Sequence, residues 1–91
     1  MLTVEYNPSG AVELYCDQDG LELLVGALVQ LKHHGGHVHL RTPAWAGDEL
    51  SEQLQGTHTD LIHHLMIVLR PDDWTAATAQ GELRTMSHLA E

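Results

Sequence analysis

The stretch Asp19–Arg41, DGLELLVGALVQLKHHGGHVHLR, decides the fold because it contains a helix, a turn and a strand in succession. Leucine and valine recur at helical spacing as far as Leu31, which predicts an amphipathic helix beginning near Asp19. The Asp19 carboxylate can accept hydrogen bonds from the first-turn amides, and Glu22 completes an acidic capping box. The pair Gly35-Gly36 ends the helix, since glycine readily adopts the left-handed conformation.

Alternating apolar and polar residues predict strands on both sides of this helix. Before it, Leu2–Tyr6 and Val12–Cys16 alternate around the turn formers Asn7–Gly10, which indicates a β-hairpin. After it, His37–Arg41 alternates with its valine and leucine on one side and its histidines and arginine on the other. Three half-buried strands are therefore expected.

The run Leu61–Leu69, which ends before Pro71, is the most apolar segment of the chain. Large aliphatic residues on both faces of such a run favour a central strand over an edge strand. The chain order strand, strand, helix, strand, strand then predicts an α+β fold. We expect a four-stranded, mainly antiparallel sheet with the helix packed on one face and the opposite face exposed.

A length of 91 residues is sufficient for one hydrophobic core and too short for two. We expect a single α+β domain over residues 1–70. Residues 71–91 form a C-terminal extension, helical or partly disordered, in which Trp74 packs against the rim of the sheet. Leucine, valine and isoleucine supply most of the large apolar groups, so the core is expected to be aliphatic.

The formal net charge of -9 excludes some classes of partner. An acidic protein is repelled by nucleic acid and by anionic membranes, so neither is an expected partner. The same charge accelerates encounter with a basic protein. It is also a common means of keeping a small protein in solution, and composition alone leaves both interpretations open.

Two features of the sequence indicate a cytoplasmic protein. Cys16 is the single cysteine, so no intramolecular disulfide can form. The segment MLTVEYNPSG lacks the basic and apolar regions of a secretory signal, and no run of residues is long and apolar enough for a membrane span.

Histidine is unusually frequent, with eight in the chain. His37 and His39 share one side of their strand, and His63 or His64 joins them if the last strand pairs with it, which would bring three imidazoles within reach of a zinc ion. The sequence pattern does not place a second closely spaced pair of Cys, Asp or Glu residues on that side of the strand. His37, His39 and His63 are therefore weak metal candidates, and we favour no metal and no other cofactor.

Catalytic motifs are missing from the sequence. Cys16 lies on a predicted strand without an adjacent base, and neither a nucleophile elbow nor a phosphate-binding glycine loop is present. The paired acids Asp48-Glu49 and Asp72-Asp73 are better explained by capping or solvation than by acid–base chemistry. We expect a protein that is not an enzyme.

The segment Thr42–Asp60 is polar, contains several breakers, and is predicted to be a variable loop in which Leu50 and Leu54 add at most one helical turn. Trp45 lies there among small residues, where a large aromatic side chain either plugs the edge of the core or anchors an interface. We take this loop as the contact region for a partner. The candidate partner-binding residues are Trp45, Asp48, Glu49, Glu52 and Asp60.

Two short motifs resemble a known family. The helix start Asp17–Leu21, DQDGL, and the segment Gly35–Leu40, GGHVHL, are similar to those of the immunity protein 32 family of bacterial polymorphic toxin systems. The resemblance covers about residues 1–70. It implies a cytoplasmic antidote that binds and neutralises a cognate toxin domain, which is expected to be basic.

Two other functions remain open at this stage. One is a metal-binding or small-molecule-binding module built on the histidine face. The other is a homo-oligomer, such as a homodimer, in which the open sheet face or the last strand pairs with its twin.

Overall fold

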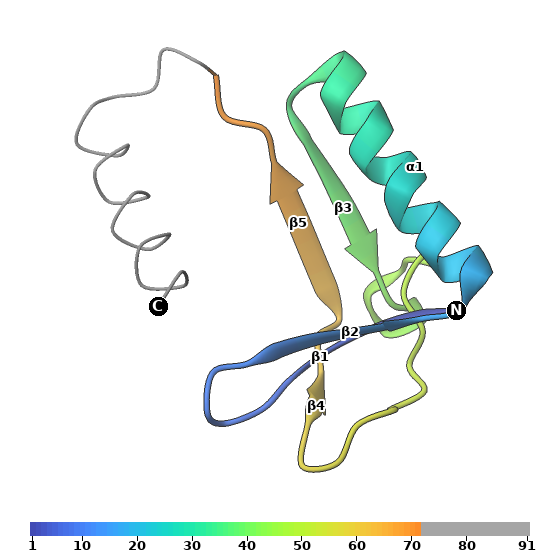
Figure 1. Ribbon diagram of the computed structural model, residues 1–91, viewed down its shortest axis with the longest axis vertical. Coiled ribbons are helices and arrows are strands. Elements are labelled where there is room, and N and C mark those ends of the chain that lie inside the picture. Colours follow the sequence, from blue (N-terminus) through green and yellow to red (C-terminus); the bar gives the residue numbers. More distant parts are fainter. Residues whose placement is uncertain (72–91) are drawn as a thin grey trace.

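The computed structural model describes residues 1–71 (Figure 1). The predicted extension, including Trp74, lies outside these residues except for Pro71. The α+β class is confirmed, with one α-helix in the described part of the chain and antiparallel strand pairing. The elements are β1 Leu2–Tyr6, β2 Val12–Cys16, α1 Gln18–His34, β3 His37–Arg41, the 3-10 helix η1 Pro43–Trp45, β4 Asp60–Leu61 and β5 His64–Val68.

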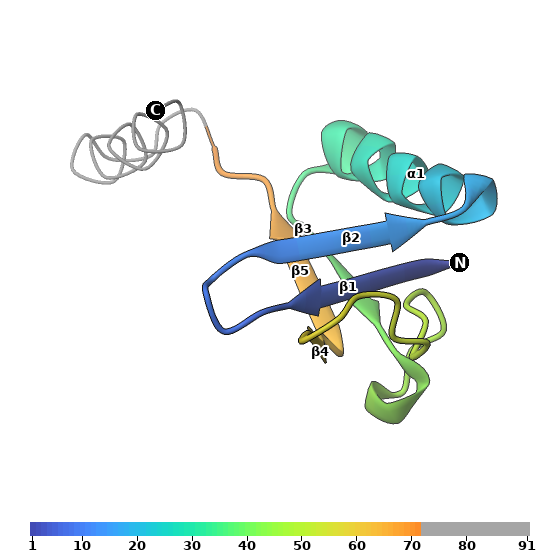
Figure 2. The ribbon, with the colours of Figure 1, turned by 60° about the horizontal axis from the view of Figure 1, so that its bottom comes forward.

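The strands form two sheets, so the expected single four-stranded sheet is wrong. One sheet has the order β2-β1-β4 and the other pairs β3 with β5. The two sheets cross, and α1 lies beside β3 and above the end of β2 (Figures 1 and 2). The predicted hairpin is confirmed, with Leu2 opposite Cys16 and Tyr6 opposite Val12.

The second sheet exists because the last apolar run breaks at Ile62 and His63. The Ile62 amide donates to the Val4 carbonyl at 2.8 Å, whereas the His63 carbonyl accepts from the Thr42 amide at 2.9 Å. Within two residues the chain therefore passes from the neighbourhood of β1 to that of β3. The expected central strand over Leu61–Leu69 is also wrong, because β5 has β3 as its one strand neighbour in residues 1–71.

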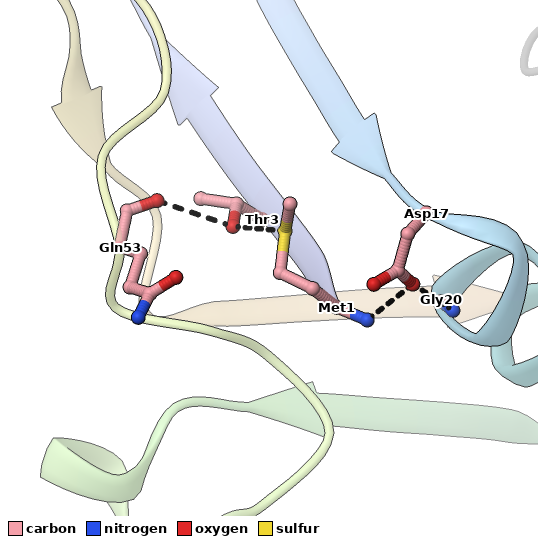
Figure 3. Close-up of polar contacts among 5 residues, drawn as sticks. All are labelled: Met1, Thr3, Asp17, Gly20 and Gln53. Carbon is pink, nitrogen blue, oxygen red and sulfur yellow. Dashed lines mark hydrogen bonds and ion pairs between the residues drawn. The ribbon is translucent and has the colours of Figure 1, made fainter.

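The helix begins two residues earlier than predicted, with Asp17 and not Asp19 as its N-cap. The Asp17 carboxylate accepts from the Gly20 amide at 2.9 Å and from the Met1 ammonium at 2.5 Å (Figure 3). These contacts bring the chain start so close to the helix that a Cβ on Gly20 would lie 1.8 Å from the Met1 carbonyl oxygen. Position 20 therefore has no room for a side chain larger than the hydrogen atom of glycine. At the other end, Gly35 has a φ of 70° and ends the helix as expected.

The core joins the two sheets through a loop residue. Leu2 and Val4 of β1 contact Leu40 of β3, and Leu50 completes the cluster at 2 % exposure. Leu50 is held there because its amide donates to the Arg41 carbonyl at 3.0 Å. The loop after η1 contains no helical turn, and it closes the core between the sheets.

The close approach at Gly20 gives a direct test. Gly20→Ala should destabilise the fold by at least about 1–3 kcal/mol, because the new methyl group overlaps backbone atoms of Met1. Gly26→Ala is the matched control in the same helix. Its Cβ meets no atom within 4 Å, so alanine should stabilise by about 0.5–1 kcal/mol. Urea unfolding of both variants measures the difference, and equal stabilities would contradict the contact.

Candidate functional site

The two-stranded sheet has one face toward the core and one face toward solvent. In its register Leu40 lies opposite Leu65, and His39 lies opposite Met66. Directly opposed residues share a face, and Leu40 is buried, so Leu65 belongs to the inner face. We call the other side the outer face. Its residues are His37, His39 and Arg41 of β3 and His64, Met66 and Val68 of β5.

Two histidines meet at the centre of the outer face. His39 Nδ1 lies 2.6 Å from His64 Nε2, and the two rings are stacked with centroids 4.8 Å apart. The His37 ring contacts His39 edge-on at 4.7 Å. A contact of 2.6 Å between ring nitrogens requires that one nitrogen donates its hydrogen to the lone pair of the other.

The surroundings of His39 favour its neutral form. Burial lowers the pKa of His39 below its usual 6.5, and the nearby positive charges of Arg41, His37 and His64 lower it further. A neutral His39 can share one hydrogen bond with His64. A doubly protonated pair would lose that bond and place two like charges in contact.

This pair predicts a dependence of stability on pH. A histidine whose pKa is lower in the folded state than the usual 6.5 binds fewer protons when the protein is folded. Its contribution to folding stability is therefore complete above pH 6.5 and is lost as the pH falls toward the folded-state pKa. The melting temperature should therefore decrease below pH 6.5. His39→Gln should reduce this slope, whereas His33→Gln at the exposed end of α1 should leave it unchanged. Equal slopes in wild type and His39→Gln would contradict the assignment.

Trp45 lies at the end of the outer face. It is 55 % exposed, so it does not plug the core. Its ring is stacked parallel to that of His63 and tilted against that of His64, with both centroids 6.2 Å away. His63 is fixed in turn by Thr42, whose Oγ1 lies 2.7 Å from His63 Nδ1. The indole is thus held in place while most of its surface faces solvent.

The structure separates the three metal candidates. His37 and His39 share the outer face as predicted, but His63 lies against Thr42 and Trp45. His64 takes the position beside His39, which the register of β3 and β5 determines. Across residues 1–71, no group of three or more His, Cys, Asp or Glu side chains is arranged to hold a metal ion.

The predicted acidic contacts do not form one patch. Glu52 accepts from the Ala44 amide at 2.7 Å and so supports η1. Asp48 and Glu49 line a hollow of about 380 Å³ with Asp19 at the start of α1, whereas Asp60 lines a different hollow on β4. Asp60 therefore lies apart from the segment after β3 that contains Trp45, Asp48, Glu49 and Glu52.

Asp48 and Glu49 influence each other directly. A hydrogen bond with Glu49 and the repulsion of its charge raise the pKa of Asp48, and the same hydrogen bond lowers the pKa of Glu49. The Glu49 carboxylate also accepts from the Asp48 amide at 2.8 Å. Of the two carboxyl groups, Glu49 therefore loses its proton more readily than Asp48.

Sequence reasoning missed the role of Glu5, which was expected on the polar side of β1. Its side chain is completely buried. The carboxylate accepts from the Gln55 amide at 2.7 Å, the Gly56 amide at 3.0 Å and Thr59 Oγ1 at 2.7 Å. Burial by itself raises the pKa of Glu5, but these hydrogen bonds outweigh it and the pKa is lowered. The charge of Glu5 holds the far half of the loop on β1.

Replacing this carboxylate should release the loop. Glu5→Gln keeps one carbonyl acceptor and replaces the second carboxylate oxygen by an NH₂ group, which would face an amide donor of the loop. The melting temperature at pH 7 should therefore fall. Because the folded-state pKa of Glu5 is lowered from 4.5, its contribution is present above pH 4.5 and lost as the pH decreases below it. Glu22→Gln on the exposed surface of α1 should change neither quantity. If the melting temperature of Glu5→Gln decreased below pH 4.5 as steeply as that of the wild type, this role would be refuted.

No family model, curated protein or solved structure matches the chain. The resemblance to the immunity protein 32 family therefore rests on the sequence pattern alone, that is, on Asp17–Leu21 and Gly35–Leu40 together with the hairpin, the aliphatic helix and the last apolar run. None of the helices formed by residues 1–71 has the length and hydrophobicity needed to cross a membrane.

Proposed function

We propose that this chain is a non-enzymatic, cytoplasmic immunity protein that binds a cognate bacterial toxin domain and neutralises it. The observation that supports a binding role is the exposed, fixed indole of Trp45 beside the outer face. An inhibitor that covers a partner needs a rigid contact surface and no catalytic group of its own.

The composition of the outer face suits a protein interface. On this face, Met66 is 52 % exposed and Val68 is 42 % exposed. Tryptophan, methionine and arginine are enriched in interfaces, and a tryptophan fixed before binding loses little conformational entropy. Arg41 on the same face adds a donor that can reach across an interface.

Charge supports a basic partner. The chain has a formal net charge of -9, and the loop that contains Trp45 also contains Asp48, Glu49 and Glu52. Many toxin domains that act on nucleic acid are expected to be basic, so these acids would accelerate encounter and orient the approach. Asp60 lies on β4, and its negative charge would contribute to this attraction from a greater distance.

The proposal is tested with the toxin domain encoded next to this chain in its genome. Trp45→Ala should weaken binding by about 2 kcal/mol or more, about thirtyfold in Kd, and should reduce protection of cells that express the toxin. Val12→Ala is the matched control, because Val12 is 57 % exposed and lies on the other sheet. Surface plasmon resonance at low and high salt should show an on-rate that falls with salt.

Three outcomes would overturn parts of this proposal. No binding to the neighbouring toxin domain would remove the immunity function. Equal losses in Trp45→Ala and Val12→Ala would remove Trp45 as the anchor, and an on-rate independent of salt would remove the electrostatic argument. A rise in melting temperature on zinc addition would instead favour the metal-binding alternative.

A further inference from the structure

Strand β5 has a second edge that no strand of residues 1–71 covers. Backbone groups of residues 63 and 69 point toward β3, because the His63 carbonyl accepts from Thr42 and the Leu69 amide donates to Gly36, both at 2.9 Å. Backbone direction alternates along a strand, so the groups of His64, Met66 and Val68 point away from β3. Figure 1 shows no strand alongside β5 on that side.

This edge lacks the features that normally prevent pairing. Natural edge strands are often protected by charged residues or by proline. The sequence of β5, HLMIV, contains neither. Among residues 1–71, each of the other strands with an open edge includes a charged residue, namely Glu13 in β2, Arg41 in β3 and Asp60 in β4. Strand β5 is thus the least protected of the four edges.

We propose that β5 pairs antiparallel with β5 of a second copy of this chain, about a two-fold axis that passes beside Met66. This register places Met66 opposite Met66 and His64 opposite Val68. In this register the outward-directed backbone groups of His64, Met66 and Val68 in one copy face those of the same three residues in the other copy, and about six hydrogen bonds can form. The result is a continuous four-stranded sheet in the order β3-β5-β5-β3.

Charge identifies a second copy as the occupant. Neither β3 nor β5 contains an aspartate or glutamate, although the whole chain has a net charge of -9. The open edge of β5 offers a basic partner no acidic residue, whereas two copies meet at this edge with the least repulsion. The opposed side chains are also compatible, with Leu65 against Ile67 on the inner face and methionine against methionine on the outer face.

The dimer does not depend on the proposed toxin-binding function. It would place both outer faces on the same side of one sheet, because a two-fold axis perpendicular to a sheet keeps each face on its own side. Two Trp45 side chains would then be presented together.

A cross-linking experiment tests the register. Opposed Cα atoms of a hydrogen-bonded antiparallel pair lie about 5.5 Å apart, within the range of a disulfide. In a Cys16→Ser background of the full chain, Met66→Cys should form a disulfide-linked dimer under mild oxidation. Val68→Cys is the matched control on the same face. Two Val68 positions would lie about 14 Å apart, four residues at about 3.4 Å each, and should not cross-link.

A charge exchange tests the interface without oxidation. Light scattering of the full chain should give twice the 10.1 kDa mass of one chain at high concentration. Met66→Lys and Met66→Glu should each give the mass of one chain, because like charges would face each other, and their mixture should regain the dimer. Val12→Lys on β2 should remain dimeric. Circular dichroism of each variant confirms that it is folded.

The proposal is overturned by any of three results. These are a wild-type mass of one chain at all concentrations, equal cross-linking at positions 66 and 68, and a dimer that persists in Met66→Lys. The second and third results would assign the dimer to another surface. None of them bears on toxin binding, which is measured separately.

Discussion

The buried carboxylate of Glu5 is the constraint on which the rest of the structure depends. It lies on β1, the central strand of the first sheet, and binds the loop at Gln55, Gly56 and Thr59. The near half of the same loop places Leu50 in the core between the sheets. One charged side chain thus fixes a segment without regular secondary structure, and this segment in turn positions η1, Trp45 and the crossing to β5.

The division into two sheets determines which side chains are available to a partner. Had Leu61–Leu69 formed one central strand, both of its edges would be hydrogen-bonded to neighbouring strands. Because the chain crosses at Ile62 and His63, β3 is the one strand of residues 1–71 that pairs with β5, and Met66 and Val68 are exposed. The histidines, Trp45 and these apolar residues therefore share one accessible face.

Local patterns were sufficient to predict much of the fold. The bounds of β1, β2 and β3 agree with the alternation in the sequence, since each strand has its own period of two and a glycine-rich turn beside it. The burial of Glu5 and Leu50 and the contact of His39 with His64 could not be predicted in this way. They depend on contacts between residues far apart in sequence and on a register that only the folded chain defines. The functional proposals rest on these same long-range contacts.

The charged side chains of residues 1–71 are unevenly distributed. Lys32 lies in the last turn of α1, and the hydrogen bond from the Leu69 amide to the Gly36 carbonyl brings the end of β5, which Arg70 follows, close to the end of that helix. The acids of residues 1–71 lie toward the opposite end, on the hairpin, the first turns of α1, the loop and β4. A positively charged molecule would be attracted to these acids before contact, and so to the part of residues 1–71 that contains Trp45.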